Sequence, residues 1–298
     1  MGYALRQPNP EDATMDNQSV LALIGPDCTA EQLGPLMERA REVSAHLAMM
    51  LVGASPPFPA ASYGSPHYGV IAVSDVWQEQ YAEGGEALKQ KGEEIEALLE
   101  THGASGDVST VYCEPPAMDD AVGRRAKICD LAYVGPDLRA APAVFDHALR
   151  GVLFASPIGA VINGMAPNGS FLPRNVFLAW NTSLPSARAV HAALPTLLAA
   201  EQVTVACFDP VMTELRDGEN PGSDLAKWLS HHGCTVTVQQ YPSGGKEIGA
   251  CIQDRAQETG ADLIVMGAYG HARMREAVFG GTTRSMIQQT GLPVLMAH

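Results

Sequence analysis

The chain has 298 residues, and its 46% hydrophobic content is enough to build more than one buried core, so two domains are expected. The formal net charge of -14 opposes binding to nucleic acid or to an anionic membrane, because both ligands attract Lys and Arg. The apolar stretches are too short or too broken to cross a bilayer, and the six cysteines form no CxxC pair, which favours reduced thiols in a cytoplasmic protein.

Residues 1–18 are predicted to be a disordered tail, because prolines and carboxylates stand where a signal peptide would carry basic and then apolar residues. An α/β domain is predicted over residues 19–162. Its first helix starts with Thr29 and Gln32 at the spacing of a capping box. The strands of this domain are expected at 19–24, 47–53, 108–113, 130–135 and 158–162, with a Pro- and Gly-rich loop at 54–68.

Residues 163–174 are predicted to link this domain to a second one over residues 175–298. Its apolar runs are short, unalternated and rich in Val and Ile, which suits strands that are buried on both faces of a parallel sheet. Strands and helices alternate, and this alternation favours right-handed βαβ units in an open, doubly wound sheet. The strands are expected at 175–180, 202–208, 235–241, 262–267 and 293–297.

The two halves resemble each other. Asp130 and Asp262 each precede four mostly apolar residues and a glycine, and Pro157 and Pro293 later open a short apolar run in each half. The sequence therefore predicts an internal duplication. Since an aspartate stands at this position in both halves, Asp130 and Asp262 are expected to have the same structural role.

The loop after the strand at 262–267 carries the residues best suited to bind a ligand. Its glycines allow the backbone to approach a ligand closely, and the N–H groups at the start of the next helix favour an anion. Because this segment also carries basic side chains, phosphate is the expected ligand. Asn181 and Thr182 follow the first strand of this half and would face the loop across the crevice, where Asn181 could read a base or ribose. The predicted binding residues are Asn181, Thr182, Gly267, Gly270, His271, Arg273, Gly280, Gly281, Thr282 and Thr283.

The arrangement G-x-x-G, nine residues, then G-[S/T], between a D-L-I-V-M-G strand and a P-V-L strand, resembles the ATP-binding signature of universal stress proteins. The resemblance covers the second half and, through its pattern, the first. It implies two tandem doubly wound five-stranded parallel sheets of strand order 3-2-1-4-5, with ATP or AMP as the ligand of the second half and a regulatory role in the stress response. It also implies pairing through the last strands, as an intramolecular pseudo-dimer and as a homodimer.

This sequence departs from the family pattern in both halves. Gly281 stands where the family usually has Ser or Thr, and Asn181 stands where the family has an acidic residue. In the first half, Gly135 is followed by Pro136 and Asp137, so that the second loop glycine is missing and a carboxylate would repel phosphate. No nucleotide is expected there.

Two other functions stay open. The protein could be an interaction scaffold that has lost its ligand, or an enzyme of the wider adenine-nucleotide hydrolase-like folds. No catalytic residue is predicted, since no nucleophile, histidine and acid stand in a triad pattern, and at most slow ATP hydrolysis is expected. His231, His232 and Cys234 are interpreted as a helix end and the start of a strand rather than a metal site.

Overall fold

The computed structural model describes residues 18–59, 74–165, 171–213, 217–268 and 281–298, so most of the predicted tail and part of the predicted linker lie outside it. The first half comprises β1 (Ser19–Ile24), α1 (Ala30–Glu42), β2 (His46–Ala54), α2 (Asp75–His102), β3 (Gly106–Cys113), α3 (Pro115–Ala126), β4 (Leu131–Val134), the 3-10 turn η3 (Pro136–Ala140), α4 (Pro142–Ala155) and β5 (Gly159–Ile162). The second half comprises β6 (Asn175–Ala179), α5 (Leu184–Ala199), β7 (Gln202–Phe208), α6 (Ser223–His231), β8 (Val236–Tyr241), α7 (Ile248–Glu258), β9 (Leu263–Gly267), α8 (Gly281–Gln288) and β10 (Val294–Ala297).

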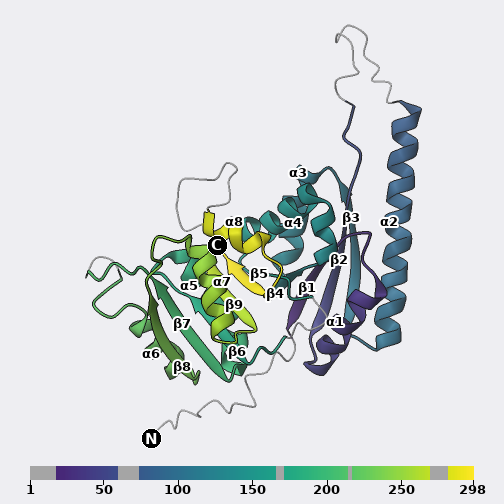
Figure 1. Ribbon diagram of the computed structural model, residues 1–298. Coiled ribbons are helices and arrows are strands. Elements are labelled where there is room, and N and C mark those ends of the chain that lie inside the picture. Colours follow the sequence, from purple (N-terminus) through teal and green to yellow (C-terminus); the bar gives the residue numbers. More distant parts are fainter. Residues whose placement is uncertain (1–17, 60–73, 166–170, 214–216, 269–280) are drawn as a thin grey trace, which may run out of the picture.

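The ten strands form one sheet in the order β3-β2-β1-β4-β5-β10-β9-β6-β7-β8 (Figure 1). Each half therefore has the strand order 3-2-1-4-5, and this confirms the predicted fold. The pairs within each half are parallel, whereas β5 and β10 pair antiparallel, with Ile162 opposite Val294 and Ala160 opposite Met296. The two halves thus form an intramolecular pseudo-dimer through their last strands, as the family resemblance implied.

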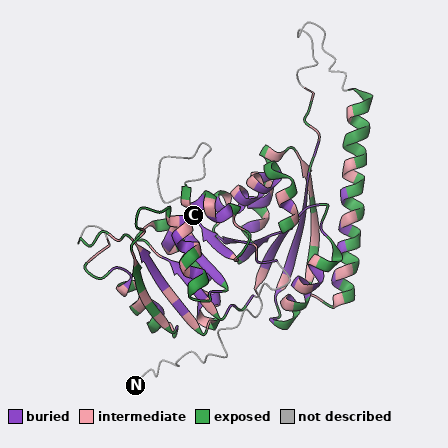
Figure 2. Ribbon diagram, in the orientation of Figure 1, coloured by how far each residue is buried: buried purple, intermediate pink, exposed green. Residues whose placement is uncertain are grey.

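Helices cover both faces of the sheet, which explains why its central strands are apolar throughout. Every residue of β4, β5 and β10 is buried (Figure 2). The core on one face takes side chains from α1, α2, α5 and α6, and the core on the other face takes them from α3, α4, α7 and α8. The two halves consequently share two continuous hydrophobic cores.

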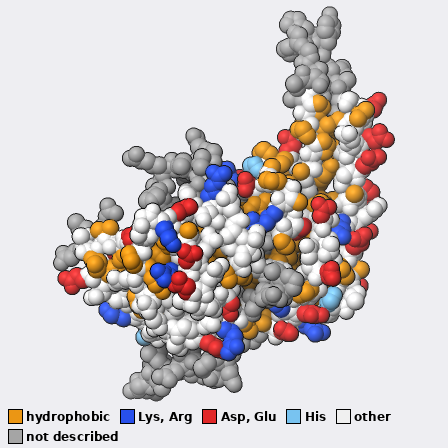
Figure 3. Space-filling model, in the orientation of Figure 1, with side chains coloured by type: hydrophobic (Ala, Val, Ile, Leu, Met, Phe, Trp, Pro, Cys, Tyr) orange, Lys and Arg blue, Asp and Glu red, His pale blue; other side chains and the backbone are white. Residues whose placement is uncertain are grey.

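Local signals in the sequence account for several helix ends. The capping box at Thr29 and Gln32 is present, with both of its hydrogen bonds formed. α2 starts after Ser74, whose hydroxyl accepts the Trp77 N–H, and it ends at Gly103 with a left-handed φ of 59°. Carboxylates line the exposed outer face of this long helix (Figure 3). None of the described helices is long and apolar enough to cross a membrane.

The two aspartates shared by the halves have the same structural role. Asp130 accepts the backbone N–H of Ser19 at 2.7 Å, and Asp262 accepts those of Arg174 and Asn175 at 2.8 and 3.0 Å. Each carboxylate therefore fixes the start of the first strand of its half beside the fourth.

The described ends of the predicted linker pack against the first half. Met165 and Phe171 are both 2% exposed, and the Phe171 ring lies 4.9 Å from that of Tyr133. This segment is therefore part of the hydrophobic core at both of its described ends. The domain boundaries at 162 and 175 remain a prediction.

Candidate functional site

The candidate site lies at the carboxyl ends of β6 and β9. β6 pairs with β7 on one side and with β9 on the other, so the direction of winding reverses between these strands. Residues that follow such strands meet at one edge of the sheet, where open α/β sheets bind ligands. The structure therefore brings Asn181 and Thr182 to the same edge as Gly267, as predicted.

Gly267 ends β9 in close contact with the start of α5. A Cβ added at this position would lie 2.4 Å from the backbone nitrogen of Ser186 and 2.7 Å from the carbonyl carbon of Pro185. Only glycine fits there without moving the helix. The close approach of β9 to α5 is thus a structural reason for this glycine, in addition to the ligand-binding role predicted for it.

Asn181 is tied to the start of the same helix. Its Oδ1 accepts the Ser183 hydroxyl at 2.5 Å, the Ser186 hydroxyl at 2.6 Å and the Ser183 N–H at 3.2 Å. Ser183 is the N-cap of α5. Within the described part of the chain no hydrogen bond is formed by the Asn181 amide nitrogen, and the residue is exposed. Asn181 can therefore offer a donor, but not an acceptor, to a ligand.

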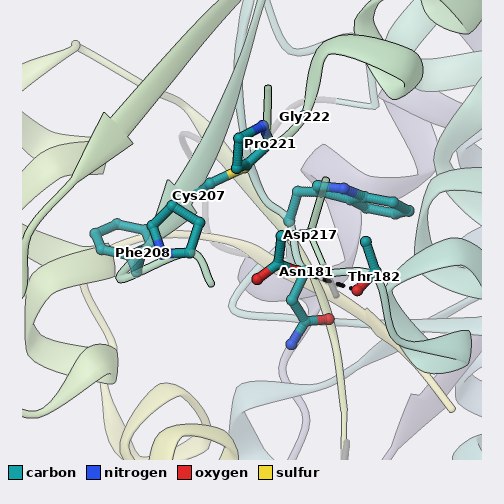
Figure 4. A pocket seen from close by; sticks show the side chains of 9 residues that line it. Asn181, Thr182, Cys207, Phe208, Asp217, Pro221 and Gly222 are labelled. Atoms are coloured by element: carbon teal, nitrogen blue, oxygen red, sulfur yellow. Dashed lines mark hydrogen bonds between the residues drawn. The ribbon is translucent and has the colours of Figure 1, made fainter. Parts of the chain in front are cut away.

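A small hollow opens beside these residues, between the ends of β6 and β7 (Figure 4). Thr182 donates to the Asp217 carboxylate across it at 3.0 Å, and Asp217 also accepts the Val211 N–H at 2.7 Å. The hollow has a volume of about 20 Å³, which holds roughly one water molecule. A purine ring would need the segment around Asp217 to move. The hollow is lined by Trp180, Asn181, Thr182, Cys207, Phe208, Pro210, Asp217, Pro221 and Gly222.

α8 presents its first turn at this edge of the molecule. The first N–H groups of a helix have no partner within the helix, and they point toward any anion at its start. Gly281 is exposed, Thr282 is half-buried, and Thr283 is 4% exposed. Thr282 is therefore better placed than Thr283 to meet a ligand. Gly270, His271, Arg273 and Gly280, the other predicted loop residues, lie outside the described residues.

Two acidic residues near the site had no signal in the sequence. A Cβ added to Gly281 would lie 3.4 Å from Oε1 of Glu247, the residue that precedes α7. Asp217 reaches Thr182 from 35 residues further along the chain. Both carboxylates depend on contacts between distant segments, and motif spacing could not have found them.

The corresponding edge of the first half is filled by a side chain of its own. Asp137 accepts the Gly25 N–H at 2.6 Å, between the ends of β1 and β4. Added Cβ atoms at Gly25 and Gly135 would both clash with this carboxylate. Burial raises the pKa of Asp137, while hydrogen bonds from the backbone oppose that rise. A carboxylate at this position would repel a phosphate group.

Comparison with known proteins connects this arrangement to one family. Residues 240–298 match the model of the universal stress protein family. A universal stress protein of Synechocystis is 50% identical over 42 residues, an alignment that covers 14% of this chain and only 15% of that relative.

Two solved structures match nearly the whole chain. A universal stress protein from Archaeoglobus fulgidus has a TM-score of 0.59 and 14% identity, and the match covers 93% of this chain and 97% of that one. A protein from Pseudomonas aeruginosa, provisionally assigned to the universal stress proteins, has a TM-score of 0.54 and 16% identity, with 94% and 92% covered. At this identity the likeness concerns the fold. The match over residues 240–298 thus connects the end of the second half to the universal stress protein family, and the chain as a whole shares the fold of these two solved structures.

Proposed function

We propose that the second half binds an adenine nucleotide, ATP or AMP, and that its occupancy serves regulation in a stress response. The contrast between the halves carries the proposal. The first turn of α8 begins at an exposed glycine, whereas α4 of the first half begins at Pro142 and is preceded by Asp137, which lies between the ends of β1 and β4. The family match covers the segment that contains the predicted loop. Members of this family bind ATP in some cases, and phosphate suits the start of a helix.

In this proposal the backbone N–H groups at the start of α8 hold the phosphates, and the Thr282 hydroxyl adds one contact. The Asn181 amide nitrogen donates to the base or ribose. The chain's own groups bind and orient the nucleotide, and no general base is assigned.

A calorimetric titration with ATP tests the proposal. Wild type should bind, and Thr282→Ala should bind about tenfold to a hundredfold more weakly, because a hydrogen bond to a charged group contributes about 1.5 to 3 kcal/mol. Thr259→Ala is the matched control. Its hydroxyl bonds to the carbonyl oxygens of Arg255 and Ala256 at the other end of α7, so affinity should not change.

The competing function is an interaction scaffold without a ligand. The small volume of the hollow and the carboxylate of Glu247 beside Gly281 favour it. The two functions differ in a direct measurement: protein purified without added ligand and then denatured should release an adenine nucleotide if it binds one tightly. Absence of ATP binding in the titration would favour the scaffold.

A photoreactive ATP analogue would locate the site. Cross-linked peptides should come from residues 175–298 alone. Labelling of peptides around Gly25 and Asp137 would contradict the assignment of the site to the second half.

A further inference from the structure

Arg139 of the first half contacts the end of α8 in the second half. It lies in η3, between β4 and α4, and its guanidinium is half-buried over the Phe145 ring, 5.0 Å from the ring centre. Its Nη1 donates to the Ile287 carbonyl oxygen at 2.8 Å, and its Nη2 lies 3.5 Å from the Gln289 carbonyl oxygen. These carbonyls belong to the last turn of α8 and to the residue just after the helix.

Asn163 completes this contact. Its backbone has a left-handed φ of 61°, and its Oδ1 accepts a hydrogen bond from Arg139 Nη2 at 2.8 Å. Its Nδ2 donates to the carbonyl oxygens of Gln289 and Leu292, at 2.9 and 3.1 Å. Asn163 follows β5 directly, so its position is set by the strand that joins the two halves.

The chemistry of this contact suits a helix end. The last four carbonyl groups of a helix have no partner within the helix, and the helix dipole makes that end negative. A guanidinium supplies both the donors and the positive charge that such an end favours. Arg139 and Asn163 therefore cap α8 from the other half of the molecule.

The opposite end of α8 is the end proposed to hold phosphate. α8 has 8 residues and is about 12 Å long, at 1.5 Å per residue. A helix this short is marginal in isolation, so its position depends on the contacts around it. Fixing its last turn therefore restricts the position of the N–H groups in its first turn.

The turn η3 of the first half thus carries two residues that make long-range contacts. Asp137 binds Gly25 within its own half, and Arg139, two residues later, reaches the helix of the other half. We propose that the first half, through Arg139 and Asn163, is a positioning element that holds α8 and so sets the affinity of the second half for phosphate. This inference rests on the proposed function.

The test compares Arg139→Gln with Arg139→Lys, which keeps the positive charge. Arg125→Gln is the matched control, since the Arg125 guanidinium binds Asp107 within the first half, at 2.7 Å from both carboxylate oxygens. Hydrogen exchange of the α8 amides, measured without nucleotide, reports on the positioning. Titration with ATP reports on its effect.

In Arg139→Gln the α8 amides should exchange at least tenfold faster, while exchange in α3 stays unchanged and excludes global unfolding. Its ATP affinity should fall about tenfold. The α8 exchange rate and the ATP affinity of Arg139→Lys should lie between those of Arg139→Gln and wild type. Arg125→Gln should behave as wild type in both measurements.

If the α8 amides of Arg139→Gln exchanged as slowly as in wild type, or exchanged faster while the ATP affinity stayed the same, the inference would be overturned. The proposed function would remain intact in either case. A wild-type protein that binds no ATP would instead contradict the proposed function, and the effect on affinity with it.

Discussion

Replacing Gly267 by alanine should destabilise the protein and distort the candidate site together. The added Cβ would lie 2.4 Å from the Ser186 nitrogen and 2.7 Å from the Pro185 carbonyl carbon. Both atoms belong to the backbone, so no side chain can rotate away. To reach an ordinary contact of about 3.4 Å, the start of α5 has to move by roughly 1 Å, and overpacking of this kind costs about 1 to 3 kcal/mol.

The same movement would disturb the ligand-facing residues. Ser186 donates to Asn181 at 2.6 Å, and its N–H is capped by Ser183. Displacing Ser186 therefore displaces Asn181. We expect a melting temperature lower by about 2 to 8 °C and a weaker ATP affinity, measured by calorimetry on the same preparations.

Gly85→Ala provides the matched control. It lies inside α2, and its added Cβ would lie 3.7 Å from the Tyr112 ring, an ordinary contact. Since alanine favours a helix interior over glycine, this variant should gain about 0.5 to 1 kcal/mol. If Gly267→Ala melted at or above the wild-type temperature, the tight contact between β9 and α5 would be refuted.

Three other predictions concern charges and thiols. Burial raises the pKa of Asp137 in the folded state, so its contribution to stability is largest at low pH and is lost as pH rises through that raised pKa. Asp137→Asn should therefore gain stability relative to wild type as pH rises above about 4, the pKa of an unperturbed aspartate, in urea unfolding. A difference in unfolding free energy that does not change with pH would contradict this. Glu247→Gln should bind ATP about twofold to fivefold more tightly in calorimetry, because it removes roughly 0.5 to 1 kcal/mol of repulsion near Gly281, and weaker binding would argue against this repulsion. Burial raises the pKa of Cys28 and of Cys207 to about 11, so roughly one thiol in a thousand is ionised at pH 8, and iodoacetamide should label both at least a hundredfold more slowly in the folded protein than in urea.

The strands could be predicted because their signal is local. Runs of apolar residues without alternation indicated strands buried on both faces, and all ten strands occur in the predicted order. The two edge strands, β3 and β8, differ from this expectation because they are not buried on both faces. The capping box at Thr29 likewise depends on residues three positions apart. The joining of the halves through β5 and β10 came from the family resemblance, since apolar runs alone do not say which strands pair.

The candidate site could be predicted only in part. The sequence indicated that Asn181, Thr182 and Gly267 lie at one edge, because the carboxyl ends of parallel strands meet there. It did not indicate that Asn181 Oδ1 is used by α5, that Asp137 binds Gly25 across 112 residues, or that Arg139 reaches α8. These contacts join segments far apart in the chain, and their side-chain geometry follows from the folded sheet.

The antiparallel contact between β5 and β10 has a consequence for experiments. In a dimer of identical chains with two-fold symmetry, each substitution occurs on both sides of the interface and in both sites. Here Ile162 and Val294 face each other as parts of one chain, so each can be changed alone. A single substitution acts once, and the unaltered half serves as an internal reference in the same molecule, at the same concentration.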